Sequence, residues 1–291
     1  MKSMRCALTV LFLLAGINAA YSLDVSLGVN AWYMWSSPTF EDQFRGEGND
    51  ITADDPVNNG PAYNDSWKLD PVMLLGPILN IRFSERWSLG LIFLVSQDID
   101  VESSYDVDNS SGTPFPFTFN AVHSWVFNRY DGDLTVNYRF DCGLGFFVGF
   151  KYLRWTAEGT YDITTTPEFG FVSHTDAEVN GLALGPAFGL SYIKQLKGML
   201  FFTASASGMV IKSREEQRNA TSTTLPAPTY TDVTKTERPY YGGFNGMAGL
   251  GYYFSALSST LILGGRLQYL KSKDEPRDIF YGVTATAMYS F

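Results

Sequence analysis

Cysteine and long apolar runs are scarce in this chain of 291 residues. It contains two cysteines, Cys6 and Cys142. Because Cys6 lies in an N-terminal segment that is expected to be removed, the mature chain is expected to hold neither an intramolecular disulfide nor a two-cysteine metal site. After that segment no stretch has 18 consecutive apolar residues, which argues against a transmembrane helix.

Basic residues are also few. Lys and Arg number 21 against 30 Asp and Glu, which gives a formal charge of −9. Loss of Lys2 and Arg5 with the N-terminal segment lowers this charge to −11. Phosphate backbones are bound by clustered Lys and Arg, so nucleic acid is not expected as a partner.

The N-terminal residues resemble a secretory signal peptide. Lys2 and Arg5 precede an apolar run over residues 7–17, and small residues follow at Ala20 and Ser22. The run is shorter than the ~20 residues that a membrane-spanning helix requires. We therefore expect residues 1–22 to be removed and residues 23–291 to form the mature protein.

The segment 277–291 predicts a strand with one fully apolar face. The residues on that face are Ile279, Tyr281, Val283, Ala285, Ala287, Tyr289 and Phe291. Alternation of period two places them on one side of a strand. The same alternation recurs in ten segments: 24–35, 70–83, 86–97, a fourth ending at 140, 144–155, 179–192, 199–211, 240–254, 259–271 and 277–291.

Ten such segments predict an all-β fold, a transmembrane antiparallel β-barrel of about ten strands, with eight as the alternative. Each strand of such a barrel turns one face to lipid and the other to the lumen. Short connections, for example 84–85 and 141–143, alternate with long polar ones at about 36–69, 98–121, 157–178 and 212–239. Short periplasmic turns and long outer loops are typical of bacterial outer-membrane barrels, so the outer membrane of a diderm bacterium is the expected location.

The inward positions divide into two groups. Apolar candidates near the outer end of the lumen are Trp32, Met34, Leu94, Trp125, Leu153 and Trp155. Charged candidates are Arg82, Asp133, Arg139, Lys151 and Arg266, of which Arg82 and Arg139 are expected near the periplasmic end, below the apolar group. The apolar group fits either a pocket for a hydrophobic small molecule or a close-packed plug. The charged group fits either a salt-bridged plug or a selectivity element.

Small inward residues on the segments 179–192, 199–211 and 240–254 leave two alternatives open. They provide free volume in the lumen, or they make room for bulky partners.

Three carboxylates continue the inward face of the third segment, at Asp98, Asp100 and Glu102. Such a set can hold Ca²⁺, attract cations, or form a solvated acidic rim. The solvated rim is the simplest interpretation, so no metal or other cofactor is expected.

The chain resembles bacterial outer-membrane proteins in its signal peptide, its alternating segments and its terminal Tyr289-Ser290-Phe291. That resemblance implies that Tyr289 and Phe291 belong to a signal read by the barrel-assembly machinery. The apolar outer lumen is similar to that of the OmpW family, which implies passage of small hydrophobic molecules. The OmpW barrels have eight strands, whereas ten are counted here.

A second resemblance is to the omptin proteases, which are ten-stranded and use an Asp pair facing an Asp-His pair. Asp98 and Asp100 match the first pair, and His174 with Asp176 the second. His174 lies in the third expected outer loop, however, where omptins use the fourth. No phosphate loop, HExxH motif or nucleophile elbow is present, so no enzymatic activity is expected.

Two functions from different classes remain. The first is a channel or porin-like barrel for passage or binding of small, hydrophobic solutes. The second is a surface-exposed adhesin or interaction barrel with a plugged lumen. Expected partners are outer-membrane lipid, the barrel-assembly machinery, a small-molecule solute and, for the second function, host surface molecules.

Deletion of Phe291 tests the assembly signal. We expect synthesis to be unaffected and membrane insertion to be impaired, because the terminal aromatic side chain lies on the lipid face and in the implied signal. Heat-modifiability of the barrel on gels measures insertion. Normal amounts of heat-modifiable, membrane-inserted protein after the deletion would remove this role.

Overall fold

The computed structural model describes residues 23–36, 71–108, 118–165, 172–224, 228–272 and 277–291. The signal segment 1–22 and nearly all of the expected loop 36–69 lie outside these ranges. The described elements are β1 (Asp24–Ser36), β2 (Val72–Arg82), β3 (Trp87–Ser96), β4 (Ile99–Asp108), β5 (Thr118–Arg139), β6 (Leu144–Thr165), β7 (Val172–Lys197), β8 (Leu200–Thr223), β9 (Thr229–Glu237), β10 (Tyr240–Phe254), the 3₁₀ turn η1 (Ser255–Leu257), β11 (Ser259–Ser272) and β12 (Asp278–Ser290). Among these residues no helix is long and apolar enough to span a membrane.

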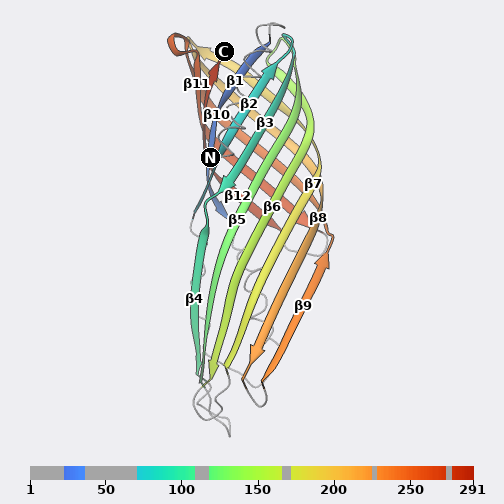
Figure 1. Ribbon diagram of the computed structural model, residues 1–291. Coiled ribbons are helices and arrows are strands. Elements are labelled where there is room, and N and C mark those ends of the chain that lie inside the picture. The colour runs from blue at the N-terminus through green and yellow to red at the C-terminus, as the bar shows by residue number, and fades with distance from the viewer. Residues whose placement is uncertain (1–22, 37–70, 109–117, 166–171, 225–227, 273–276) are drawn as a thin grey trace.

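Ten of these strands close into an antiparallel barrel (Figure 1). The order is β10, β11, β12, β1, β2, β3, β5, β6, β7 and β8, and β8 pairs back onto β10. The first and last strands, β1 and β12, pair with each other, and Ser26 lies opposite Ser290. The predicted all-β barrel of ten strands is therefore confirmed.

Four neighbouring strands are much longer than a membrane requires. β5 to β8 contain 22 to 26 residues each. At the usual rise per residue this is about 75 to 90 Å, whereas roughly 9–11 residues cross a bilayer. β4 and β9 pair with the outer parts of β5 and β8, while β3 and β10 pair with their inner parts. β4, β9 and the outer parts of β5 to β8 thus form a six-stranded extension, here called the wall (Figure 1).

The wall replaces much of what the sequence predicted as loops. The range 98–121 contains β4 and the start of β5, 157–178 contains the end of β6 and the start of β7, and 212–239 contains the end of β8 and all of β9. These stretches carry polar residues on both faces, so the apolar alternation that marks a lipid-facing strand disappears there although the strand continues.

The outward face of the barrel carries an apolar belt. Phe188 is 64% exposed and Leu263 is 54% exposed. Tyr281 at 49% and Val283 at 54% are also exposed, and both lie on the apolar face that the sequence predicts for segment 277–291. Aromatic pairs lie at both ends of the belt. Trp87 contacts Tyr138 with ring centroids 4.9 Å apart at the periplasmic end, and Trp35 stacks on Tyr281 at 6.1 Å near the outer end.

A closed barrel with an apolar belt and two aromatic girdles satisfies its backbone hydrogen bonds internally and matches the bilayer on its surface. The predicted location in the outer membrane of a diderm bacterium is confirmed.

The small inward residues of β7 and β10 make room for aromatic rings on the neighbouring strand. Trp155 lies directly opposite Gly181, and a Cβ built on Gly181 would overlap its indole ring. Phe201 and Gly251 form the same kind of pair between β8 and β10. At these positions the second alternative from the sequence holds, and the space is filled.

Replacement of Gly181 by alanine tests this packing. We expect a loss of about 1–3 kcal/mol in the free energy of unfolding, because the added methyl group displaces a packed indole ring. Gly242→Ala is the matched control, because a Cβ at Gly242 meets no atom within 4 Å. Urea unfolding of the barrel in lipid, followed by tryptophan fluorescence, measures both. Equal stabilities for the two variants would contradict the packing.

Candidate functional site

A cluster of charged side chains occupies the lumen. Arg129, Asp131 and Asp133 project inward from β5 at a spacing of two residues, which keeps them on one face. Lys151 on β6 and Arg266 on β11 join them. The side chain of Asp131 is fully buried and that of Lys151 is 1% exposed.

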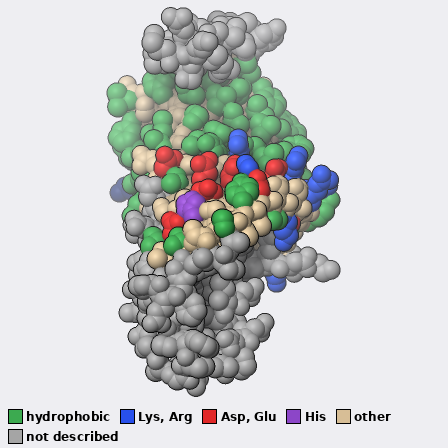
Figure 2. Space-filling model, turned by 60° about the horizontal axis from the view of Figure 1, so that its bottom comes forward, with side chains coloured by type: hydrophobic (Ala, Val, Ile, Leu, Met, Phe, Trp, Pro, Cys, Tyr) green, Lys and Arg blue, Asp and Glu red, His purple; other side chains and the backbone are tan. Residues whose placement is uncertain are grey.

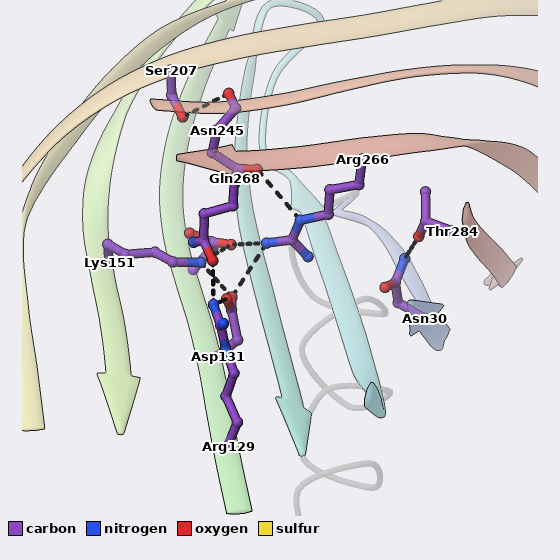
Figure 3. Close-up of polar contacts among 10 residues, drawn as sticks. Asn30, Arg129, Asp131, Lys151, Ser207, Asn245, Arg266, Gln268 and Thr284 are labelled. Atoms are coloured by element: carbon purple, nitrogen blue, oxygen red, sulfur yellow. Dashed lines mark hydrogen bonds and ion pairs between the residues drawn. The ribbon is translucent and has the colours of Figure 1, made fainter. Parts of the chain in front are cut away.

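Asp131 is the centre of the cluster (Figure 3). Its Oδ1 contacts Lys151 Nζ and lies 3.3 Å from Arg266 Nη2, and its Oδ2 lies 3.4 Å from Arg129 Nη2. Asp133 Oδ2 lies 3.0 Å from Lys151 Nζ and 3.5 Å from Arg266 Nη2. Three cations therefore share two carboxylates, and of the five side chains only Asp133, at 19% exposure, is appreciably exposed.

These ion pairs cross the full width of the barrel. β5 and β11 are five strands apart in either direction around the ten-stranded ring, so they face each other across the lumen. Arg266 of β11 binds both carboxylates of β5, and Arg129 of β5 donates to the side-chain oxygen of Gln268 on β11. The cluster therefore bridges opposite walls of the barrel.

An apolar layer surrounds the charges. Trp32, Leu74 and Leu94 are completely buried. Arg266 lies over the Trp32 ring, with Cζ 4.3 Å from the centroid, and Arg129 lies over Phe280 at 4.0 Å. The other members of the buried apolar cluster are Met34, Val72, Leu153, Ala183, Ala187, Met209, Ile211, Tyr241 and Leu270. Together the charged and apolar side chains fill the lumen at this level.

Most of the predicted apolar lumen residues meet in this layer. Trp32, Met34, Leu94 and Leu153 belong to the cluster, and Trp155 packs against it. Trp125 does not belong to it. It lies further out on β5, opposite Gly159 of β6.

The predicted charged group is divided between two places. Asp133, Lys151 and Arg266 lie in the cluster, but Arg82 and Arg139 are exposed at the periplasmic rim, where they line a pocket of about 410 Å³. Arg82 Nη1 pairs there with Asp24 Oδ2 at 3.1 Å. The sequence placed an apolar region of the lumen above a charged one. The structure differs, because the buried charged side chains and the apolar layer lie at the same level of the barrel.

Sequence reasoning missed Arg129 and Asp131 as members of the cluster. The inward–outward alternation of side chains along β5 could have identified Arg129 and Asp131, since they precede the inward Asp133 by four and two residues. The alternation of the expected fourth strand was extended outward to Trp125, but Arg129 and Asp131, which lie between Trp125 and Asp133 on the same face, were not named.

Below the cluster the lumen is lined by small polar side chains. Asn30 donates to the hydroxyls of Thr284 and Thr286, at 3.3 and 2.5 Å, and the hydroxyls of Ser26 and Ser290 lie 2.8 Å apart.

The predicted acidic set at the outer end is only partly described. Asp98 is exposed between β3 and β4, and the side chains of Asp100 and Glu102 lie outside the described part of the structure. Within the described residues no group of three His, Cys, Asp or Glu side chains could hold a metal ion. A role of these three residues with cations remains a prediction.

His174 lies on the outward face of the wall between two carboxylates. Its Nδ1 is 2.5 Å from Asp162 Oδ1 and its Nε2 is 3.3 Å from Asp176 Oδ1. The hydrogen bond to Asp162 raises the pKa of His174 above its usual value. Through the pairing of β7 with β6, β6 with β5 and β5 with β4, His174 lies level with Ser104. Asp98 precedes Ser104 by six residues, so it lies about 20 Å closer to the membrane than His174 and three strands away from it. The described residues do not bring Asp98 and His174 together as omptins do.

Comparisons with known proteins agree on the fold only. Neither a protein-family model nor a curated protein matches the sequence. Among solved structures, the outer membrane protease OmpT from Escherichia coli aligns with 13% identity and a TM-score of 0.44, covering 92% of this chain and 96% of that one. Neisserial surface protein A aligns with 16% identity and a TM-score of 0.25, over 69% and 99% of the chains. A FadL homologue from Pseudomonas aeruginosa aligns with 10% identity and a TM-score of 0.27, over 92% and 90%.

These similarities are too weak to assign an activity to the chain. The chain is an outer-membrane β-barrel by its architecture, and the resemblance to the OmpW family stays a prediction.

Asp131→Asn tests the cluster. The substitution removes the carboxylate that all three buried cations contact, so we expect a loss of about 3–5 kcal/mol in the free energy of unfolding. Asp24→Asn is the matched control, because it breaks an exposed pair that is worth at most about 1 kcal/mol. Urea unfolding in lipid measures both. Asp131→Asn and Asp24→Asn proteins of equal stability would show that the cluster does not hold the barrel together.

Proposed function

We propose that this protein is a surface-interaction barrel, in which a closed membrane barrel holds the wall outside the cell and the wall binds a macromolecular partner without catalysis. The observation that carries this proposal is the wall itself. Four strands continue far beyond the length that lipid requires, and two further strands, β4 and β9, are added only there.

The closed lumen supports a function outside the membrane. A general diffusion pore needs a continuous aqueous path, and the ion pairs between β5 and β11 cross that path. Asp131, Lys151, Gln268 and Trp32 are buried to 1% exposure or less. Passage of a solute would require these contacts to break.

The two edges of the wall support binding. In the described residues β4 pairs only with β5, and β9 pairs only with β8. All nine residues of β9 are exposed. An exposed edge strand presents unpaired backbone N–H and C=O groups, which an extended segment of another protein can bind by adding a strand.

The outward face of the wall is strongly charged. Figure 2 shows acidic side chains gathered around a histidine, with basic side chains to one side. Glu178 and Asp176 lie on this face with His174, and Arg218 pairs with Asp232 at 2.6 Å. Charged rims of this kind favour specific encounter with a complementary partner.

The test combines conductance with attachment. Refolded barrel in planar bilayers should give no steady conductance. Vesicles that carry the barrel should attach to surfaces coated with extracellular-matrix protein, and attachment should fall when the β9 edge is blocked. Val233→Pro and Thr234→Pro form a matched pair, because N–H groups of successive strand residues point to opposite sides and only one of the two faces the open edge.

One of the two proline variants should therefore lose attachment while remaining folded. Steady conductance of the wild-type barrel, or attachment that neither variant changes, would contradict the proposal.

A second candidate function is passage of small, hydrophobic solutes. The polar side chains of Asn30 and Thr284 in the lower lumen favour it, because amide and hydroxyl groups are more compatible with a water-filled path than an apolar plug would be. Breaking the cluster would then open the path. If the protein passes solutes, Asp131→Asn should raise conductance or solute uptake in the folded barrel. A surface-interaction barrel gives no reason to expect either increase.

A further inference from the structure

We propose that β8, β10 and β11 form a binding site for the phosphate groups of a lipid headgroup at the outer edge of the apolar belt. The site consists of Lys212 and Lys271 on either side of Gly242. It concerns how the barrel is held in its membrane and goes beyond the interaction of the wall with a partner.

Both lysines lie on the lipid-facing side, just beyond the belt. Lys212 follows the exposed Val210 by two residues on β8, and Lys271 follows Tyr269 by two residues on β11, so each continues the outward face of its strand. Both side chains are exposed. Lys212 Nζ lies 5.5 Å from the centroid of the Tyr240 ring, which is itself 61% exposed. This is the level at which headgroups meet an outer aromatic girdle.

The register brings the two lysines around one gap. Lys212 is opposite Tyr240, and Gly242, two residues further along β10, is opposite Lys271. The two lysine Cα atoms are therefore about 12 Å apart across β10. Gly242 faces outward, and a Cβ built on it meets no atom within 4 Å. A phosphate group over Gly242 would lie between the two ammonium groups.

Among the described residues, these lysines differ from neighbouring cations in having no acidic partner. On the wall, Lys235 pairs with Glu237 at 2.5 Å and Arg214 with Glu216 at 3.6 Å. In the part of the chain that the structure describes, Lys212 and Lys271 make no ion pair. In a chain with a formal charge of −9, two neighbouring lysines that pair with none of the described carboxylates form a local positive site.

The position favours a lipid rather than a free anion. Lysines at a membrane surface attract anionic headgroups. Their stems can lie along an apolar surface while the ammonium groups reach the headgroup. A lipid gains contact with Val210 and the rest of the belt through its acyl chains, which a free phosphate does not.

The test uses the refolded mature chain and native mass spectrometry. The probes are an acylated glucosamine disaccharide that carries two phosphates, phosphatidylcholine as the neutral lipid, and inorganic pyrophosphate as the free anion. We expect the wild-type barrel to retain the phosphorylated glycolipid in preference to the other two. The double variant Lys212→Gln/Lys271→Gln should lower the affinity for the glycolipid about tenfold or more.

Two variants separate this site from general charge and from misfolding. Lys194→Gln/Lys197→Gln removes two exposed lysines at the periplasmic end and should leave glycolipid binding unchanged. Gly242→Leu keeps both charges but fills the gap, and it should also weaken glycolipid binding. Heat-modifiability confirms that each variant is folded.

Three outcomes would overturn the proposal. They are wild-type affinity in the Lys212→Gln/Lys271→Gln variant, an equal loss in the periplasmic control, and binding of pyrophosphate as tight as that of the glycolipid. The last would assign the site to free phosphate.

Discussion

The structure depends on one constraint, which is that every backbone N–H and C=O group in contact with lipid needs a partner within the protein. The seams between β1 and β12 and between β8 and β10 meet it by closing the sheet into a ring. Outside the bilayer water can satisfy backbone groups, and the constraint ends. There the ring gives way to the wall, and β4 and β9 each end as an edge with one paired side.

Closure also determines what happens inside the barrel. Alternate residues of every strand must point into the lumen, and a ring of this size leaves a space that side chains can fill. The charges that enter it are compensated across the diameter, with Arg266 on β11 binding the carboxylates of β5. Since Trp32 and the other apolar side chains pack around these ion pairs, we propose that the barrel serves as a closed anchor. This is why the features available for recognition lie on the wall and at the membrane boundary.

Much of the barrel could be predicted from the sequence, because a lipid-facing strand has to alternate. Tyr281 and Val283 were assigned to the correct face, and Lys151 and Arg266 to the lumen. The wall could not be predicted in this way, since β9 has no apolar face for an alternation to reveal. Nor could the contacts of the cluster, because which inward residues meet across a barrel depends on the stagger between strands. The pairing of Trp155 with Gly181 shows the same limit: the sequence left two alternatives open, and only the register of β6 and β7 decided between them.

The central claim is that the barrel is embedded only as far as the apolar belt and that β7 continues from there into water as part of the wall. The accessibility of spin labels along β7 tests this claim most directly. Labels would be placed one at a time on the outward face at Phe188, Leu184, Glu178 and His174, with Cys142 replaced by serine. We predict that oxygen in the lipid reaches the labels at Phe188 and Leu184. A water-soluble nickel complex should reach those at Glu178 and His174. Lipid accessibility that continues without change to His174 would contradict the claim.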